Sequence, residues 1–87
     1  MKNIIEIKNL YRRFDSFVAV NNISFAVKQG ELFAFLGTNG AGKSTTISMI
    51  CTLLPKTSGS ITVDGFDTDK EAAKVRSRLG VVFQSFR

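Results

Sequence analysis

A glycine-rich stretch that directly follows a short apolar run limits what this chain can fold into more than any other feature. Residues 32–36 are apolar at every position, which is typical of a strand buried on both faces of a parallel sheet. Residues 37–44 then follow the pattern Gly, four residues, Gly, Lys, and Ser or Thr. Residues 44–54 carry apolar side chains at helical spacing and contain no Gly or Pro, so we expect a helix ended by Pro55. This order of strand, glycine loop and helix predicts a phosphate-binding loop.

Each residue type in the loop has a physical reason. Gly40 and Gly42 leave the backbone N–H groups open to a phosphate and allow positive φ. The helix that follows directs the positive end of its dipole at the same phosphate. Lys43 brings an ammonium group to the β and γ phosphates, and the Ser44 hydroxyl is a ligand of the type that Mg²⁺ binds. The candidate nucleotide-binding residues here are Gly37, Asn39, Gly40, Ala41, Gly42, Lys43, Ser44 and Thr45.

The first third of the chain alternates between apolar and polar residues in the manner of strands. Ile5 and Ile7, continued by Asn9, share one face of a first strand. We expect a turn at residues 15–16 and a second strand over residues 18–27, disturbed near residues 21–22. Short strands that follow one another this closely favour antiparallel pairing.

The region after the expected helix predicts three further elements. Residues 61–63 form a short strand, ended by a turn at residues 64–65. Thr68 and Glu71 have the spacing of a capping box in front of a helix, and residues 81–83 predict another strand that reaches Gln84. The whole chain is therefore expected to be an α/β protein of the P-loop NTPase class. An antiparallel β lobe stands beside the start of a parallel core sheet with the phosphate-loop helix, and the domain is incomplete.

Composition narrows the class of partner. The 87 residues are 44% hydrophobic and 22% charged, which fits one small globular unit. The net charge of +5 would suit a nucleic acid or a membrane surface, but only Arg12 and Arg13 are adjacent, so a solvated surface is favoured. The single cysteine excludes an internal disulfide and fits a reducing compartment.

Several separate stretches resemble the ATP-binding subunit of ABC transporters. The resemblance runs from about residue 5 to residue 84 and is strongest in GELFAFLGTNGAGKSTTISMICTLLPKTSGSITVDGFD. Within it, NGAGKSTT is similar to the family's phosphate loop and TSGSI to the strand after its first helix. RLGVVFQ is similar to the segment that ends in the family's Q-loop glutamine.

The resemblance implies roles for two residues outside the loop. Phe14, at the family's spacing from Leu10, would stack on adenine, whereas the alternative is one more core residue among eight Phe. Gln84 would contact Mg²⁺ or the attacking water and sense the permease, and the alternative is an exposed polar residue at a strand end. The implied ligands are ATP and Mg²⁺, with Ser44 and Gln84 as the metal contacts.

The sequence also departs from the family pattern. Thr38 stands where Pro or Glu is common. The Leu-Ser-Gly-Gly-Gln signature, the Mg²⁺-binding Asp with its catalytic Glu, and the switch His are absent from these 87 residues, which contain no His. Residues 1–87 are thus expected to be the N-terminal part of a single ABC-type ATP-binding domain, without its helical subdomain and C-terminal part. We expect no catalytic residue in it and no ATP turnover by the chain alone.

The resemblance implies a subunit that couples ATP hydrolysis to transmembrane transport, in the style of bacterial exporters. Its partners would be a permease subunit and a second ATPase subunit, in a homodimer or a pair, and no nucleic acid. It would be cytoplasmic, peripheral at the inner face of the cell membrane through the permease. The alternatives are a soluble ABC-type ATPase that works without a permease and a non-catalytic truncated module.

Overall fold

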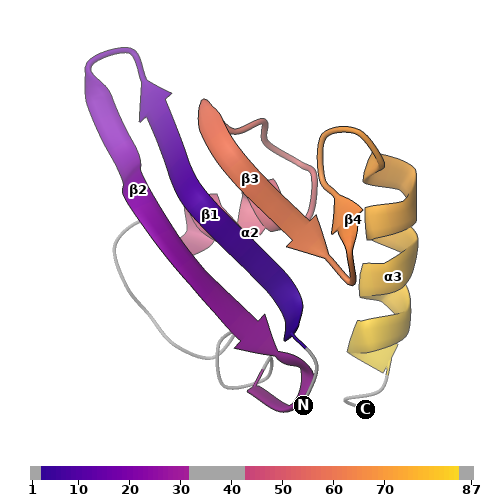
Figure 1. Cartoon of the computed structure of the whole chain (residues 1–87). Coiled ribbons are helices and arrows are strands. Elements are labelled where there is room, and N and C mark those ends of the chain that lie inside the picture. The colour runs from indigo at the N-terminus through magenta and orange to yellow at the C-terminus, as the bar shows by residue number, and fades with distance from the viewer. Residues whose placement is uncertain (1–2, 32–42, 85–87) are drawn as a thin grey trace.

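The computed structural model describes residues 3–31 and 43–84, with the backbone alone for residues 82–84. Its main feature is a four-stranded sheet in the order β2-β1-β3-β4, antiparallel at each described pairing (Figure 1). The elements are β1 (Asn3–Phe14), β2 (Phe17–Lys28), the 3₁₀ turn η1 (Gln29–Glu31), α2 (Lys43–Ile50), β3 (Ser58–Val63), β4 (Phe66–Asp67) and α3 (Ala72–Gln84). The predicted antiparallel lobe is confirmed, whereas the strand expected at residues 32–36 lies outside the described residues.

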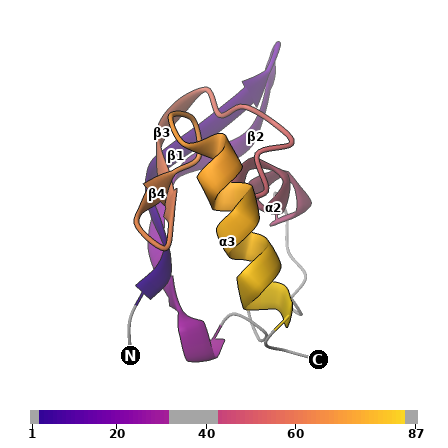
Figure 2. The ribbon, with the colours of Figure 1, turned by 90° about the vertical axis from the view of Figure 1, so that its right-hand side faces the viewer.

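The two helices lie on different parts of the sheet. Helix α2 lies behind β1 and β3 in Figure 1, and α3 runs beside the short edge strand β4. In the turned view of Figure 2, α3 stands in front with α2 beyond it. The buried core of the described residues lies between the sheet and these helices, and consists of Ile4, Ile5, Ile7, Leu10, Val20, Val27, Met49, Ile50, Ile61, Val63, Val75 and Leu79.

Strands β1 and β2 form a long hairpin. Phe14 pairs with Phe17 across a two-residue turn, in which Asp15 adopts a φ of 50°. Asp is one of the residue types that tolerate this left-handed conformation, since its short polar side chain bonds locally. The turn predicted at residues 15–16 is confirmed. The disturbance predicted near residues 21–22 is confirmed as well, because Asn22 has a φ of 54°.

A second irregularity changes which residue of β1 enters the core. Asn9 has a φ of 51°, and the pairing of β1 with β2 shifts register between Ile7 and Leu10. The Asn9 N–H donates to Ser24 Oγ at 2.8 Å, its side chain is exposed, and Leu10 is fully buried. The expectation that Asn9 shares the face of Ile7 is therefore wrong. A bulge adds one residue to the strand and moves the next side chain to the buried face.

Strands β3 and β4 form a second, shorter hairpin. Val63 pairs with Phe66, and the two residues between them, Asp64 and Gly65, have φ values of 51° and 85°. Positive φ at both central positions is the type I′ geometry that matches the twist of paired strands. The predicted turn is confirmed. The Arg78 Nε donates to Asp64 Oδ2 at 2.7 Å, which ties this turn to α3.

Helix α2 ends four residues earlier than the sequence predicted. The Leu53 N–H donates to the Ser48 carbonyl at 2.9 Å and the Thr52 N–H donates to the Met49 carbonyl at 3.2 Å. Thr52 has a φ of 63°, so these two bonds complete a Schellman motif. Pro55 disfavours helical geometry in the residue before it, which makes an earlier end to the helix favourable.

The turn before α3 uses a different cap from the one expected. Asp67 Oδ1 accepts from the N–H groups of Asp69 at 2.8 Å and Lys70 at 3.0 Å. Glu71 Oε1 in turn accepts from the Asp67 N–H at 3.4 Å. Thr68 is buried, and its own N–H donates to the Ile61 carbonyl at 3.1 Å. The assignment of Thr68 as the cap is therefore wrong by one residue, while Glu71 does bond back as in a capping box.

The strand predicted at residues 81–83 is also wrong, because α3 continues through them to Gln84. A short apolar run cannot be assigned to strand or helix by periodicity alone. Val75 and Leu79 are buried four residues apart, so the helical face that enters the core is set before this run, in which Val81 is exposed. A helix also bonds its backbone internally, whereas a strand needs a neighbouring strand.

Candidate functional site

The first turn of α2 holds the three described residues of the predicted phosphate loop. Lys43, Ser44 and Thr45 are its consecutive first residues, with Ser44 exposed and the other two half-buried. The first N–H groups of a helix have no acceptor within the helix, and the positive end of its dipole lies there. No acidic side chain stands in this turn, so nothing on α2 itself competes with an anion.

The opposite side of α2 holds the helix against the sheet. Thr46, Met49 and Ile50 are buried, and Met49 and Ile50 belong to the main core. The Ser48 hydroxyl donates to the Ser44 carbonyl at 3.0 Å within the helix. The buried side chains of α2 thus face the sheet, while Ser44 on the first turn stays exposed to solvent.

The tip of the β1–β2 hairpin carries the predicted base contact. Phe14 keeps 39% of its surface exposed and lies outside the core, so the alternative of a core Phe does not describe its position. Its neighbours across the turn, Phe17 and Val18, are 65% and 41% exposed. The Arg12 guanidinium lies over the Phe14 ring, with Cζ 4.2 Å from the ring centroid. An aromatic ring in solvent is available for stacking, and this one already has a cation beside it.

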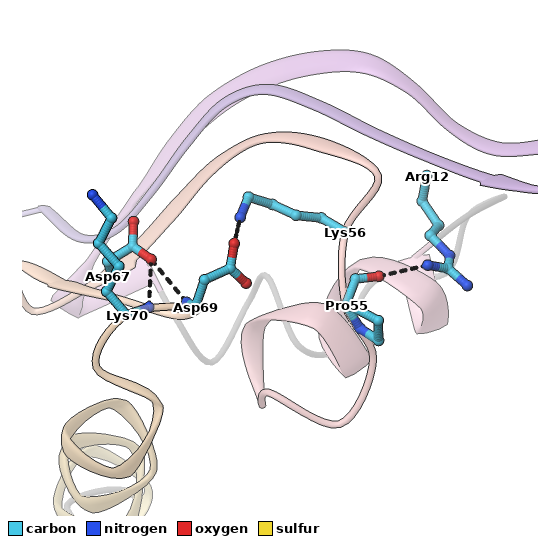
Figure 3. Close-up of polar contacts among 6 residues, drawn as sticks. All are labelled: Arg12, Pro55, Lys56, Asp67, Asp69 and Lys70. Carbon is cyan, nitrogen blue, oxygen red and sulfur yellow. Dashed lines mark hydrogen bonds and ion pairs between the residues drawn. The ribbon is translucent and has the colours of Figure 1, made fainter.

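The hairpin end is bonded to the segment that leaves α2. Arg12 Nη1 donates to the Pro55 carbonyl at 2.8 Å, as Figure 3 shows. The Thr57 N–H donates to the Tyr11 carbonyl at 2.9 Å, and the Arg13 N–H donates to Thr57 Oγ1 at 3.0 Å. These three bonds join positions more than forty residues apart in the chain, with separations of 43 residues for Arg12–Pro55 and 44 for Arg13–Thr57. They connect the hairpin end to the segment that follows the C-terminal end of α2.

Arg12 was not among the functional residues predicted from the sequence. A signal was present, since residues two apart on a strand share a face and Arg12 stands two before Phe14. The bond to Pro55 had no such signal, because it depends on how the loop after α2 folds back on β1.

The remaining predicted site residues are described in part or not at all. Gly37, Asn39, Gly40, Ala41 and Gly42 lie outside the described residues. Gln84 is the last residue of α3, with its backbone alone described. The structure brings Lys43, Ser44 and Thr45 together in one turn, and it sets Phe14 apart on the hairpin tip.

The four acids that follow α2 all have structural partners. Asp64 bonds Arg78, Asp67 caps the turn before α3, Asp69 pairs with Lys56, and Glu71 pairs with Lys74 at 3.5 Å. Figure 3 shows the Asp67 and Asp69 contacts. Within residues 3–31 and 43–84, no cluster of three His, Cys, Asp or Glu side chains could hold a metal ion. Mg²⁺ at a nucleotide needs no such cluster, since it takes one or two protein oxygens, phosphate oxygens and waters, and the exposed Ser44 hydroxyl fits that role.

A family model for ABC transporters matches residues 20–87, which is more than half of the chain. The chain belongs to the ABC transporter family. It is 47% identical over 85 residues to the probable multidrug ABC transporter ATP-binding protein YbhF of Escherichia coli strain K12, covering 98% of this chain and 15% of that protein. It is also 47% identical over 81 residues to the linearmycin resistance ATP-binding protein LnrL of Bacillus subtilis strain 168, covering 93% of this chain and 26% of that protein. The chain therefore spans about a quarter or less of these family members.

Solved structures of the family agree with the fold. The cbiO1 protein of Clostridium perfringens, part of the ABC transporter complex cbiONQ, matches with a TM-score of 0.67 and 23% identity over 91% of this chain and 32% of that chain. An ATP binding subunit of an ABC transporter matches with a TM-score of 0.62 and 25% identity over 84% of this chain and 30% of that chain. These matches confirm the predicted α/β fold class of the P-loop NTPases. Within the described part of the chain, neither helix has the length and apolar character needed to cross a bilayer.

Proposed function

We propose that this chain binds ATP as part of the nucleotide site of an ABC-type ATPase subunit. The observation that carries the proposal is the place of Lys43, Ser44 and Thr45 as the first turn of α2, directly after the glycine pattern of residues 37–42. Backbone N–H groups, a helix dipole and one ammonium then converge on the same anion. The names of the relatives, which are ATP-binding proteins of transporters, support ATP as that anion.

Different residues of this chain contact different parts of the nucleotide. Lys43 neutralises the β and γ phosphates, Thr45 donates a further hydrogen bond, and Phe14 stacks on adenine. Ser44, with Gln84, would hold Mg²⁺, which neutralises phosphate charge when it is bound. In the whole protein, hydrolysis is an in-line attack of water on the γ-phosphate, and positioning and charge stabilisation supply most of the catalysis.

The proposed setting follows from the family. Residues 1–87 belong to the N-terminal part of a single ABC-type ATP-binding domain, in a subunit that couples hydrolysis to transport, in the style of bacterial exporters. Its partners are a membrane permease and a second ATPase subunit, and its place is the cytoplasmic face of the membrane. Sedimentation of the tagged protein with membranes supports this setting. Sedimentation with ribosomes would support a soluble ABC-type ATPase instead.

Calorimetric titration of the purified chain with Mg²⁺ and ATP tests the phosphate site. Lys43→Ala removes a charge-assisted contact of about 1.5–3 kcal/mol, so the affinity for ATP should fall about tenfold or more. Lys70→Ala is the matched control, because Lys70 is an exposed lysine of the turn before α3 and its removal changes the net charge equally. Equal affinities in the two variants would overturn the phosphate-loop assignment.

A second candidate function, ATP binding without turnover, is favoured by one observation. Each of the four acids after α2 is held by a structural partner, so none is left as a general base to activate water. We expect the chain alone to release no phosphate from ATP above the level of its Lys43→Ala variant. Sustained release that this substitution abolishes would instead assign hydrolysis to the chain itself.

A further inference from the structure

The guanidinium of Arg12 makes two contacts that point in different directions. Its Cζ lies 4.2 Å from the centroid of the Phe14 ring, and its Nη1 donates to the Pro55 carbonyl at 2.8 Å (Figure 3). A planar guanidinium at this distance covers one face of the ring. With the guanidinium in place, Phe14 still keeps 39% of its surface exposed.

The Arg12 side chain is also half-buried. Its Nε is buried and has no hydrogen-bond partner among the described residues. A buried donor without a partner lowers stability, so other contacts of the side chain must offset this cost. Those contacts are the Phe14 ring and the Pro55 carbonyl. The guanidinium thus lies between the aromatic ring and a backbone carbonyl.

Arg12 also joins the tip of the β1–β2 hairpin to the segment that leaves α2. Phe14 ends β1, and Pro55 stands five residues after the last residue of α2. The neighbouring bonds of Thr57 to Tyr11 and Arg13 use the backbone of β1 and leave the Phe14 ring untouched. Within the described residues, Arg12 is therefore the side chain that bonds the α2 exit segment and touches the ring.

We infer that Arg12 is a positioning residue for the nucleotide base. It holds the Phe14 ring with one face covered and the other free for adenine, and it fixes this ring relative to the segment that leaves α2. This inference rests on the proposed function. A cation on one face also withdraws electron density from the ring, which favours an electron-rich purine on the opposite face.

The role predicts a loss of affinity that depends on the base. Calorimetry on the purified chain compares Mg²⁺–ATP with inorganic tripolyphosphate, which has the phosphates and lacks the base. Arg12→Ala should weaken ATP binding about two- to fivefold and leave tripolyphosphate binding unchanged. Arg13→Ala, an exposed arginine one residue along with the same loss of charge, should change neither affinity.

Two further variants separate positioning from folding and from charge. Arg12→Lys keeps the charge and a donor for the Pro55 carbonyl but has no planar face, so it should keep the melting temperature and still weaken ATP binding. In a Phe14→Ala background, Arg12→Ala should cause no further loss of ATP affinity, because its effect passes through the ring.

The results that would contradict the inference differ from the result that would contradict the proposed function. An equal loss of ATP and tripolyphosphate affinity in Arg12→Ala would assign Arg12 to general charge or folding and overturn the inference. Additive losses in the double variant would overturn it as well. Failure of the unaltered chain to bind either ligand would instead refute the proposed function, and the inference with it.

Discussion

The sheet and helix α2 carry the two ends of the proposed nucleotide site, and they are built very differently. Eight of the twelve buried core residues of the described chain lie on β1, β2 and β3. Helix α2 has eight residues and contributes Met49 and Ile50 to that core. An isolated helix of this length is marginal in water, so its stability comes from these few contacts.

This difference assigns separate roles to the two regions. The sheet is a rigid support, and the exposed side chains at its hairpin tip can change without loss of the core. Helix α2 provides the first turn of the proposed phosphate site and keeps little buried surface of its own. Local opening is easiest where buried contacts are few. A bound nucleotide should therefore stabilise α2 more than the sheet.

The largest expected effect tests the rigidity of the sheet at Gly59, near the start of β3. Gly59 has a φ of 93°, and a Cβ built on it would lie 2.2 Å from the Asn9 carbonyl oxygen and 2.8 Å from the Leu10 Cα. Gly59→Ala should lower the free energy of unfolding by about 2–5 kcal/mol, through backbone strain and the forced separation of β1 from β3. Chemical denaturation measures this loss.

Gly65→Ala is the matched control for that prediction. Gly65 has a similar φ of 85°, but nothing lies within 4 Å of a Cβ at this position. Gly65→Ala should therefore lower the free energy of unfolding only by the conformational cost of positive φ, about 1–2 kcal/mol. If the two variants lose the same stability, β1 and β3 do not approach as closely as the structure has them.

The next prediction tests whether Phe14 at the hairpin tip acts in nucleotide binding and not in the core. Phe14→Ala should reduce the affinity for ATP about fivefold or more, because a base–aromatic stack contributes about 1–3 kcal/mol. The free energy of unfolding should fall by less than about 1 kcal/mol, because the ring lies outside the core. Phe14→Tyr and Phe14→Trp should keep the affinity, since any flat ring can stack.

Leu10→Ala provides the contrast on the same strand. Leu10 is fully buried, so its truncation should lower the free energy of unfolding by about 2–5 kcal/mol. Thermal melting and calorimetry on both variants give the comparison. A large stability loss in Phe14→Ala with unchanged ATP affinity would move the stacking role away from Phe14.

Features that are encoded in consecutive residues could be predicted from the sequence. The phosphate loop is encoded in consecutive residues, so its pattern reveals the chemistry without any knowledge of the fold. Turns at Asp15 and Asp64 were also predictable, because each stands in a local sequence that favours positive φ.

Features that depend on distant partners were not predictable. The bulge at Asn9 is fixed by Ser24 across the sheet, and the bond from Arg12 to Pro55 needs the loop after α2 to fold back. The end of α2 at Ile50 was missed because a Thr at left-handed φ is unusual, and no periodic pattern signals it. In each case a single long-range or strained contact overrides a reasonable local expectation.

The smallest effect concerns residues 80–84, part of which the sequence predicted as a strand and the structure has as a helix. Gly80 is an exposed position inside α3 without positive φ, and a Cβ there would meet nothing within 4 Å. Glycine in a helix interior costs about 0.5–1 kcal/mol relative to alanine. Gly80→Ala should therefore raise the free energy of unfolding by about that amount and increase the helical circular dichroism signal.

The reverse substitution on the same helix, Ala73→Gly, is the control for this last prediction. Ala73 is exposed in the first turn of α3, so Ala73→Gly should lower the free energy of unfolding by up to about 1 kcal/mol. If residues 81–83 form a strand that Gly80 opens with positive φ, alanine at position 80 must lower the stability instead, because Cβ disfavours that conformation. The two arrangements thus predict changes of opposite sign at Gly80 and the same sign at Ala73. A loss of stability in Gly80→Ala would therefore indicate that α3 ends before Gly80 and that residues 81–83 form a strand.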